Sequence, residues 1–151
     1  MNLAMVRYLL GWMLGVEAVF LLFPALTALI YQEHEIGAFL SAALLCAVIC
    51  WLLCRRKPEN TRFYAREGFV TVACCWIVLA LTGALPFLLT GEIASPIDAL
   101  FETISGFTTT GATILSDVEA LSHASLLWRS LTHWIGGMGV LVFMLAILPL
   151  A

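Results

Sequence analysis

The chain has 151 residues, of which 62% are apolar and 11% are charged, and its mean hydropathy is +1.02. Soluble globular domains are about 45–50% apolar and about 25% charged. This composition therefore excludes an ordinary soluble domain and favours an integral membrane protein surrounded by a lipid bilayer. The net charge of −3 carries little information by itself, and no basic tract indicates nucleic-acid binding.

The first apolar segment covers about residues 8–31 and ends at the polar sequence YQEHE. It is longer than the roughly 7–15-residue apolar core of a signal peptide and long enough to span a bilayer, which takes about 20 helical residues. We therefore expect a retained transmembrane helix. Glu17 lies near its centre. An intramembrane carboxylate is usually functional, but we interpret Glu17 as a structural contact with another helix rather than as an ion-handling group.

Three further apolar segments predict three more spans, over about residues 36–54, 68–90 and 126–150. The five cysteines fall in the second and third segments, where membrane cysteines usually behave as small apolar residues. No His or carboxylate accompanies them at metal-ligand spacing. The sequence thus predicts an all-α membrane protein with four transmembrane helices. An N-terminal pair with its basic loop would form one unit, residues 1–67, and the rest would form a second, residues 68–151.

Basic and acidic residues fall on opposite sides of these spans. Six of the seven basic residues precede the first span or lie between the second and third: Arg7, Arg55, Arg56, Lys57, Arg62 and Arg66. Because cytoplasmic loops carry an excess of Lys and Arg, we expect a cytoplasmic N-terminus. Seven of the ten acids lie on the opposite, outer side: Glu33, Glu35, Glu92, Asp98, Glu102, Asp117 and Glu119. They predict either a negative vestibule that concentrates cations or a solvated polar face.

A short helix is expected on the outer side, over residues 96–107. Ser95 suits an N-cap, Pro96 suits the first helical position, and Asp98 in the first turn complements the helix dipole. Apolar residues then follow at helical spacing: Ile97, Leu100, Phe101 and Ile104. Roughly eleven residues span about 17 Å at 1.5 Å per residue. This length is too short to cross the bilayer and suits a re-entrant helix.

The short helix is followed by TTTGAT, residues 108–113, which we call the Thr/Gly segment. Irregular backbone at membrane depth is tolerated only where it is buried in protein or lines a water-filled cavity. Glycine allows successive carbonyls to face one way, and such carbonyls, with Thr hydroxyls, can replace the hydration shell of an alkali cation. The segment therefore predicts a monovalent-cation site, with an ordinary extracellular linker as the alternative.

The sequences PIDALFETISGFTTTGATIL (96–115) and LLWRSLTHWIGGMGVLVFMLAILP (126–149) resemble one membrane–pore–membrane repeat of the Trk/Ktr/HKT potassium-transporter superfamily. The two preceding spans match the bacterial TrkH/TrkG type, so the resemblance covers essentially the whole chain. It implies a pore helix at 96–107 and a selectivity filter formed by Thr108, Thr109, Thr110, Gly111, Ala112 and Thr113. K⁺ would bind at Thr109, Thr110 and Gly111, as the transported ion rather than as a cofactor, and no covalent cofactor or enzymatic activity is implied.

The family has four such repeats in one chain, whereas this sequence ends after one, at Ala151. We interpret it as the N-terminal portion of a longer transporter of the bacterial inner membrane. The partners implied are the downstream repeats, a second copy of the full-length form in a homodimer, and a cytoplasmic nucleotide-binding regulator of the TrkA kind. The alternative is a complete small membrane protein, acting as an interaction subunit or as a homotetrameric cation pore.

Two polar residues near the outer end of the fourth span are candidate supports of the filter. Arg129 either neutralises an outer acid such as Asp117 or Glu119, holds the back of the filter, or extends its charge to the interface. His133 lies one turn further on, and a proton relay through it is the weaker interpretation. The small residues Gly136, Gly137 and Gly139 predict close helix packing or a bend beside the pore.

Overall fold

The computed structural model describes residues 2–58 and 64–147, which fold into six α-helices and one 3₁₀ turn. Their bounds are α1 Leu3–Ile30, α2 Ile36–Cys54, α3 Ala65–Gly83, α4 Leu85–Thr90, α5 Pro96–Phe107, η1 Val118–Ala120 and α6 His123–Ile147. No strand occurs in these ranges. Arg62 of the basic loop and the last residues of the fourth predicted span lie outside them.

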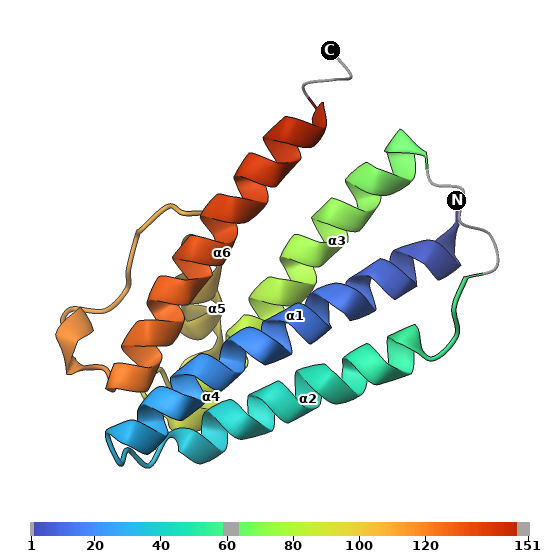
Figure 1. Ribbon diagram of the computed structural model, residues 1–151. Coiled ribbons are helices and arrows are strands. Elements are labelled where there is room, and N and C mark those ends of the chain that lie inside the picture. Colours follow the sequence, from blue (N-terminus) through green and yellow to red (C-terminus); the bar gives the residue numbers. More distant parts are fainter. Residues whose placement is uncertain (1, 59–63, 148–151) are drawn as a thin grey trace.

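Helices α1 and α2 form an antiparallel hairpin (Figure 1), and glycines of α1 lie where the two helices touch. A Cβ added to Gly11 would lie 2.9 Å from Cβ of Leu53, and one added to Gly15 would lie 2.9 Å from Sγ of Cys50. The absence of side chains at both glycines lets the two backbones approach closely. All five cysteines carry free thiols, and the described residues contain no metal-ligand cluster.

The third predicted span is not one continuous helix, because it breaks at Ala84 between α3 and α4. Pro86 lies in the first turn of α4. Its ring has no N–H to donate to the carbonyl four residues earlier and clashes with that carbonyl, which kinks or breaks a helix. We did not expect this break. The last six residues of the predicted span, Leu85–Thr90, form a separate short helix after this break.

Three stretches are long and apolar enough to cross a membrane: Leu3–Ile30, Ile36–Cys54 and Arg66–Thr90. Only the described residues were searched for such stretches. The protein is an all-α membrane protein. The fourth predicted span contains a 25-residue helix, α6, but α6 is not among these three, so its crossing of the membrane remains a prediction. The N-terminal end of α1 and the C-terminal end of α2 meet at one side of the molecule (Figure 1), where Arg7 donates a hydrogen bond to the Arg56 carbonyl.

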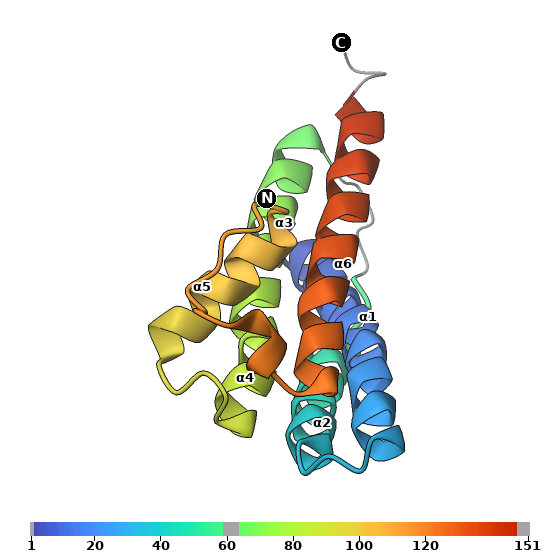
Figure 2. The same ribbon diagram turned by 90° about the vertical axis from the view of Figure 1, so that its left-hand side faces the viewer.

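The short helix α5 packs against α3 and α6, and the chain returns alongside it after residue 107 (Figure 2). Its polar residues face the protein, because Glu102, Thr103 and Ser105 are buried. Its apolar stripe faces outward, and Ile97 is 78% exposed. The fold therefore leaves the apolar face of α5 open and uses its polar face to position the Thr/Gly segment.

Candidate ion-binding site

Helix α5 starts as its sequence predicts. The Ser95 side chain accepts a hydrogen bond from the Asp98 N–H, and Pro96 occupies the first turn. The helix then runs twelve residues to Phe107, about 18 Å at 1.5 Å per residue. Its C-terminal end, which carries the negative end of the helix dipole, leads directly into the Thr/Gly segment.

The backbone turns sharply at the start of the Thr/Gly segment. Thr109 has φ +56° and Gly111 has φ +75°, both in the left-handed region. Glycine adopts this region freely, whereas a β-branched residue such as threonine does so only under local constraint. Hydrogen bonds from the Thr110 and Gly111 N–H groups to the Ser105 carbonyl, 2.9 and 3.5 Å, supply that constraint.

These contacts leave several carbonyls of the Thr/Gly segment without a hydrogen-bond donor among the described residues. All six residues of the segment are exposed. The carbonyls of Thr109, Thr110 and Gly111 accept no hydrogen bond from the described residues, whereas the Ala112 carbonyl accepts one from the Ser105 hydroxyl at 2.6 Å. Thr109, Thr110 and Gly111 thus present three consecutive free carbonyls, and the next carbonyl, that of Ala112, is turned back toward α5. The Thr108 and Thr110 hydroxyls lie 2.8 Å apart on the same exposed surface.

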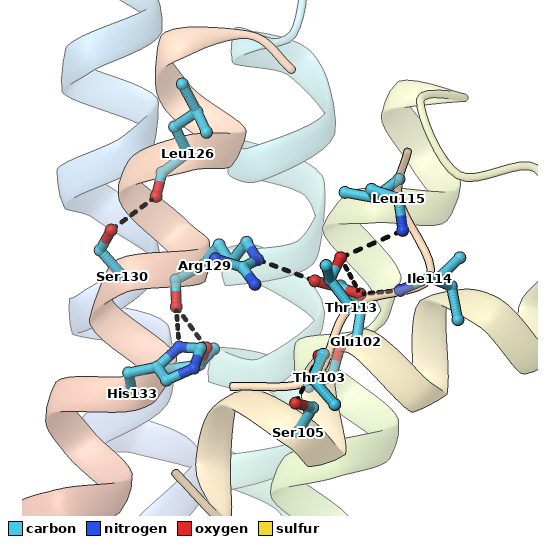
Figure 3. Close-up of polar contacts among 12 residues, drawn as sticks. Glu102, Thr103, Ser105, Thr113, Ile114, Leu115, Leu126, Arg129, Ser130 and His133 are labelled. Atoms are coloured by element: carbon cyan, nitrogen blue, oxygen red, sulfur yellow. Dashed lines mark hydrogen bonds and ion pairs between the residues drawn. The ribbon is translucent and has the colours of Figure 1, made fainter. Parts of the chain in front are cut away.

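A buried glutamate of α5 anchors the far end of the segment (Figure 3). Glu102 is 2% exposed, and its Oε2 accepts hydrogen bonds from the Thr113 hydroxyl, 3.0 Å, and the Ile114 N–H, 3.2 Å. Its Oε1 is 2.7 Å from Nε of Arg129 on α6. Both carboxylate oxygens are therefore used, and one residue connects α5, α6 and the chain that leaves the Thr/Gly segment.

This geometry identifies the partner of Arg129, which the sequence left open among an outer acid, the back of the filter and the membrane interface. The guanidinium pairs with Glu102 and not with Asp117 or Glu119. Glu102 itself is not an outer vestibule acid, because it is buried. His133 makes only a local contact, since its Nδ1 lies 2.9 Å from the Arg129 carbonyl one turn earlier. Of the two predicted supports, Arg129 reaches the back of the segment through Glu102, and no described contact joins His133 to it.

Helices α5 and α6 touch at two glycines. A Cβ added to Gly106 would overlap the Thr132 side chain, and one added to Gly136 would overlap the Phe107 backbone. Gly137 is different, because its added Cβ would lie 3.9 Å from the Thr109 methyl group, an ordinary contact. The backbone of α6 thus approaches the C-terminal end of α5 at Gly136. Of the glycines that predicted close packing, Gly136 is the one that makes this contact.

Two of the acids that we expect on the outer side bind the start of α6. Glu33, in the loop between α1 and α2, accepts hydrogen bonds from the His123 and Ala124 N–H groups at 2.8 and 3.1 Å. Glu92 accepts one from the Ser122 N–H at 2.5 Å and contacts the Ser125 hydroxyl. Burial opposes ionisation of Glu33, but the His123 and Ala124 N–H groups and the His123 ring together lower its pKa below the ordinary 4.5. Glu33 is thus a cap of α6.

Sequence reasoning missed Glu102 as a residue of the site. A signal was present, since Glu102 and Ser105 are three residues apart and share a helix face that avoids Ile97, Phe101 and Ile104. We counted Glu102 with the outer acids because it lies in the outer segment. Sequence position alone does not reveal whether a polar face turns toward solvent or toward the protein.

These features define a class: an all-α membrane protein in which a short helix leads into an exposed loop with free carbonyls, held from behind by an ion pair. Residues 35–151 match the family model TrkH, described as a cation transport protein. The chain belongs to this family. The family consists of transporters, so the expectation that the chain is not an enzyme is confirmed.

Individual relatives agree with this assignment. The chain is 38% identical to the Trk system potassium uptake protein TrkH of Vibrio parahaemolyticus over 93% of its length, and 40% identical to that of Escherichia coli K12 over 86%. It is 33% identical to an uncharacterized cation transporter of Methanocaldococcus jannaschii over 91%. The crystal structure of the Vibrio potassium transporter TrkH superposes with a TM-score of 0.91 at 34% identity, over 99% of this chain and 32% of that one. The chain spans about 30% of the length of these relatives.

Proposed function

We propose that this chain is part of the ion-conducting subunit of a Trk-type potassium uptake system in the plasma membrane. The Thr/Gly segment would supply one of four filter strands. The observation that carries the proposal is the row of free carbonyls at Thr109, Thr110 and Gly111, placed at the C-terminal end of α5. Carbonyl oxygens can replace the water around K⁺, and the helix dipole favours a cation at this end.

One strand cannot surround an ion, so the other three strands would come from the repeats that follow in a longer chain. This agrees with the share of the relatives that the chain covers, about 30%. Transport needs no covalent chemistry, because ions would move down their electrochemical gradient through the filter. Glu102 and Arg129 would fix the strand from behind, so that its carbonyls keep their spacing during ion passage.

The wider assembly follows from the same proposal. The N-terminus would lie in the cytoplasm of a bacterium, because Arg7, Arg55, Arg56 and Lys57 gather on one side of the spans. The full-length form would pair as a homodimer in the inner membrane. A cytoplasmic nucleotide-binding regulator of the TrkA kind would dock on the same side.

A chimera tests the function. The matching segment of the Vibrio TrkH is replaced by this chain, and the product is expressed in a bacterium that lacks its own potassium uptake. We expect growth at low K⁺ and uptake of a K⁺ tracer. Failure of a correctly inserted chimera to take up K⁺ would contradict the proposal.

A matched pair of glycine substitutions then tests the Thr/Gly segment. Gly111 and Gly91 have nearly the same φ, +75° and +76°, and neither has an atom within 4 Å of an added Cβ. Gly111→Asp is expected to abolish uptake or its preference for K⁺ over Na⁺, whereas Gly91→Asp, in the outer loop after α4, carries the same backbone strain and keeps both. Equal effects would show that the segment has no special role.

A further inference from the structure

Glu17 lies in the middle of α1, and its carboxyl group lies beside the end of α3, where α3 packs against α5. It is 2% exposed. Its Oε2 lies 2.5 Å from Oγ1 of Thr82 at the end of α3, and its Oε1 has no hydrogen-bond partner among the described residues. A Cβ added to Gly83 would lie 3.2 Å from this Oε1 and 2.9 Å from both the Phe107 ring and the Thr103 methyl group. Glu17, the α3–α4 break and the C-terminal end of α5 therefore meet at one point.

A count of hydrogens indicates which group donates in the contact with Thr82. The Thr82 hydroxyl also lies 2.8 Å from the Val78 carbonyl, one turn earlier in α3. A hydroxyl has a single hydrogen but can accept two, and donation to the carbonyl one turn back is the usual arrangement of a helical threonine. Thr82 could share its one hydrogen between the two oxygens in a three-centre bond, but two full hydrogen bonds at 2.5 and 2.8 Å require Glu17 to donate to Thr82. A carboxylic acid can donate, whereas a carboxylate cannot.

The surroundings of Glu17 supply no charge to balance a carboxylate. No Lys, Arg or His nitrogen in the described ranges lies within 4.0 Å of it. The titratable groups of helix α2 are the thiols of Cys46, Cys50 and Cys54, none of which carries a positive charge. Helix α3 contributes Thr82, and helix α5 contributes Thr103 and Phe107. From helix α6, the Trp128 Nε1–H donates a hydrogen bond to the nearby Gly83 carbonyl. An isolated buried carboxylate is very costly, so such a group takes up a proton instead.

We propose that Glu17 holds a proton as a neutral carboxylic acid and is a positioning residue for α5. By donating to Thr82, it fixes the turn that carries Gly83 against Phe107, directly before the Thr/Gly segment. The N-terminal hairpin, which contributes no residue to the Thr/Gly segment, thereby helps to place that segment. The consequence for ion selectivity rests on the proposed function, whereas the bound proton does not.

Infrared spectroscopy of the chimera in lipid vesicles tests for the proton directly. Glutamate labelled with ¹³C at the side-chain carboxyl shifts the C=O stretch of a protonated acid and so identifies it. We expect this band at neutral pH in the parent chimera, its loss in Glu17→Gln, and its retention in Glu119→Gln, which changes an exposed glutamate. Thr82→Val should shift the band to higher frequency, because the acid loses its acceptor. A spectrum unchanged by both Glu17→Gln and Thr82→Val would overturn the proposal.

Transport measurements test the positioning role. Glutamine has the size of glutamic acid and can also donate to Thr82, so Glu17→Gln should keep the K⁺ over Na⁺ uptake ratio of the parent. Glu17→Met has similar bulk but no donor, and it should lower that ratio. A normal ratio in Glu17→Met, or loss in both variants, would overturn the role. If the parent chimera transports no K⁺, the proposed function fails, while the infrared result still decides whether Glu17 holds a proton.

Discussion

Arg129 and Glu102 form an ion pair directly behind the Thr/Gly segment, with 2.7 Å between Nε and Oε1. The Glu102 side chain is fully buried, and that of Arg129 is 20% exposed. The other oxygen of Glu102 binds Thr113 and Ile114 (Figure 3). The pair therefore links α6 to the end of the segment, and removal of either partner should displace both α6 and the end of the segment.

Removal of the cation should leave an uncompensated buried charge. We expect Arg129→Gln to lower the free energy of unfolding by about 3–5 kcal/mol, the usual effect of breaking a buried pair. The measurement is denaturant unfolding in detergent micelles, followed by circular dichroism.

Two further variants separate the ion pair from a general effect of charge. The double variant Arg129→Gln with Glu102→Gln should recover part of the loss, because it leaves no buried charge. Lys57→Gln removes an exposed cation and should change stability by less than about 0.5 kcal/mol. If Arg129→Gln behaves like Lys57→Gln, the pair does not stabilise the fold.

The contact between Gly136 and Phe107 should tolerate no side chain. Gly136→Ala would place a methyl group on the Phe107 backbone, which cannot rotate away. Helices α5 and α6 must then separate, and overpacking of this kind destabilises by about 1–3 kcal/mol. Gly137→Ala is the matched control, because its methyl group meets only an ordinary contact at 3.9 Å. Thermal unfolding of the two variants side by side checks the prediction, and equal midpoints would contradict it.

Ser105 should control the direction of the Ala112 carbonyl. Ser105→Ala removes the 2.6 Å hydrogen bond that turns this carbonyl toward α5 and should cost about 0.5–1.5 kcal/mol. The freed carbonyl would also alter ion preference in the chimera, measured as the ratio of K⁺ to Na⁺ uptake. Ser130→Ala removes only an exposed hydrogen bond within α6, 3.0 Å to the Leu126 carbonyl. An unchanged ratio in Ser105→Ala would rule out this role.

Stability should depend on pH through Glu33. Its pKa in the folded protein is lower than its ordinary value of 4.5, because of the His123 and Ala124 contacts that outweigh its burial. The carboxylate cap of α6 is thus fully stabilising above about pH 4.5 and is lost as the pH falls through the lowered pKa. Other acids titrate here too, so the observable is the difference between the parent and Glu33→Gln. The variant should be less stable at pH 6, and the difference should shrink toward pH 3.

The helices could be predicted from sequence because long apolar runs and capping residues are local signals. Ser95 and Pro96 mark the start of α5, and the apolar run from residue 36 ends where α2 ends, at Cys54. The break at Ala84 was missed because Leu85 to Thr90 are almost as apolar as the rest of the span. Pro86 was the local clue, but a proline in a membrane helix often only kinks it.

For the candidate site, the position of the segment in the chain could be predicted, but its three-dimensional contacts could not. The Thr/Gly segment was recognised from its composition and its resemblance to a repeat, and its role as a filter remains a prediction. The partner of Arg129 was not predictable, because Glu102, Asp117 and Glu119 are all near enough in sequence to reach α6. Packing of α5 decides among them, by turning its polar face inward. Contacts over 65 residues, such as Glu17 with Thr82, have no local signal at all.

The cap that Glu33 provides to α6 also has a consequence for biosynthesis. Glu33 and the His123 N–H that donates to it are 90 residues apart, so the loop between α1 and α2 is made long before the helix that it caps. Until residue 123 has been synthesised, the Glu33 carboxylate cannot make this contact. Formation of this contact therefore requires that the α1–α2 loop and the start of α6 have both reached their places.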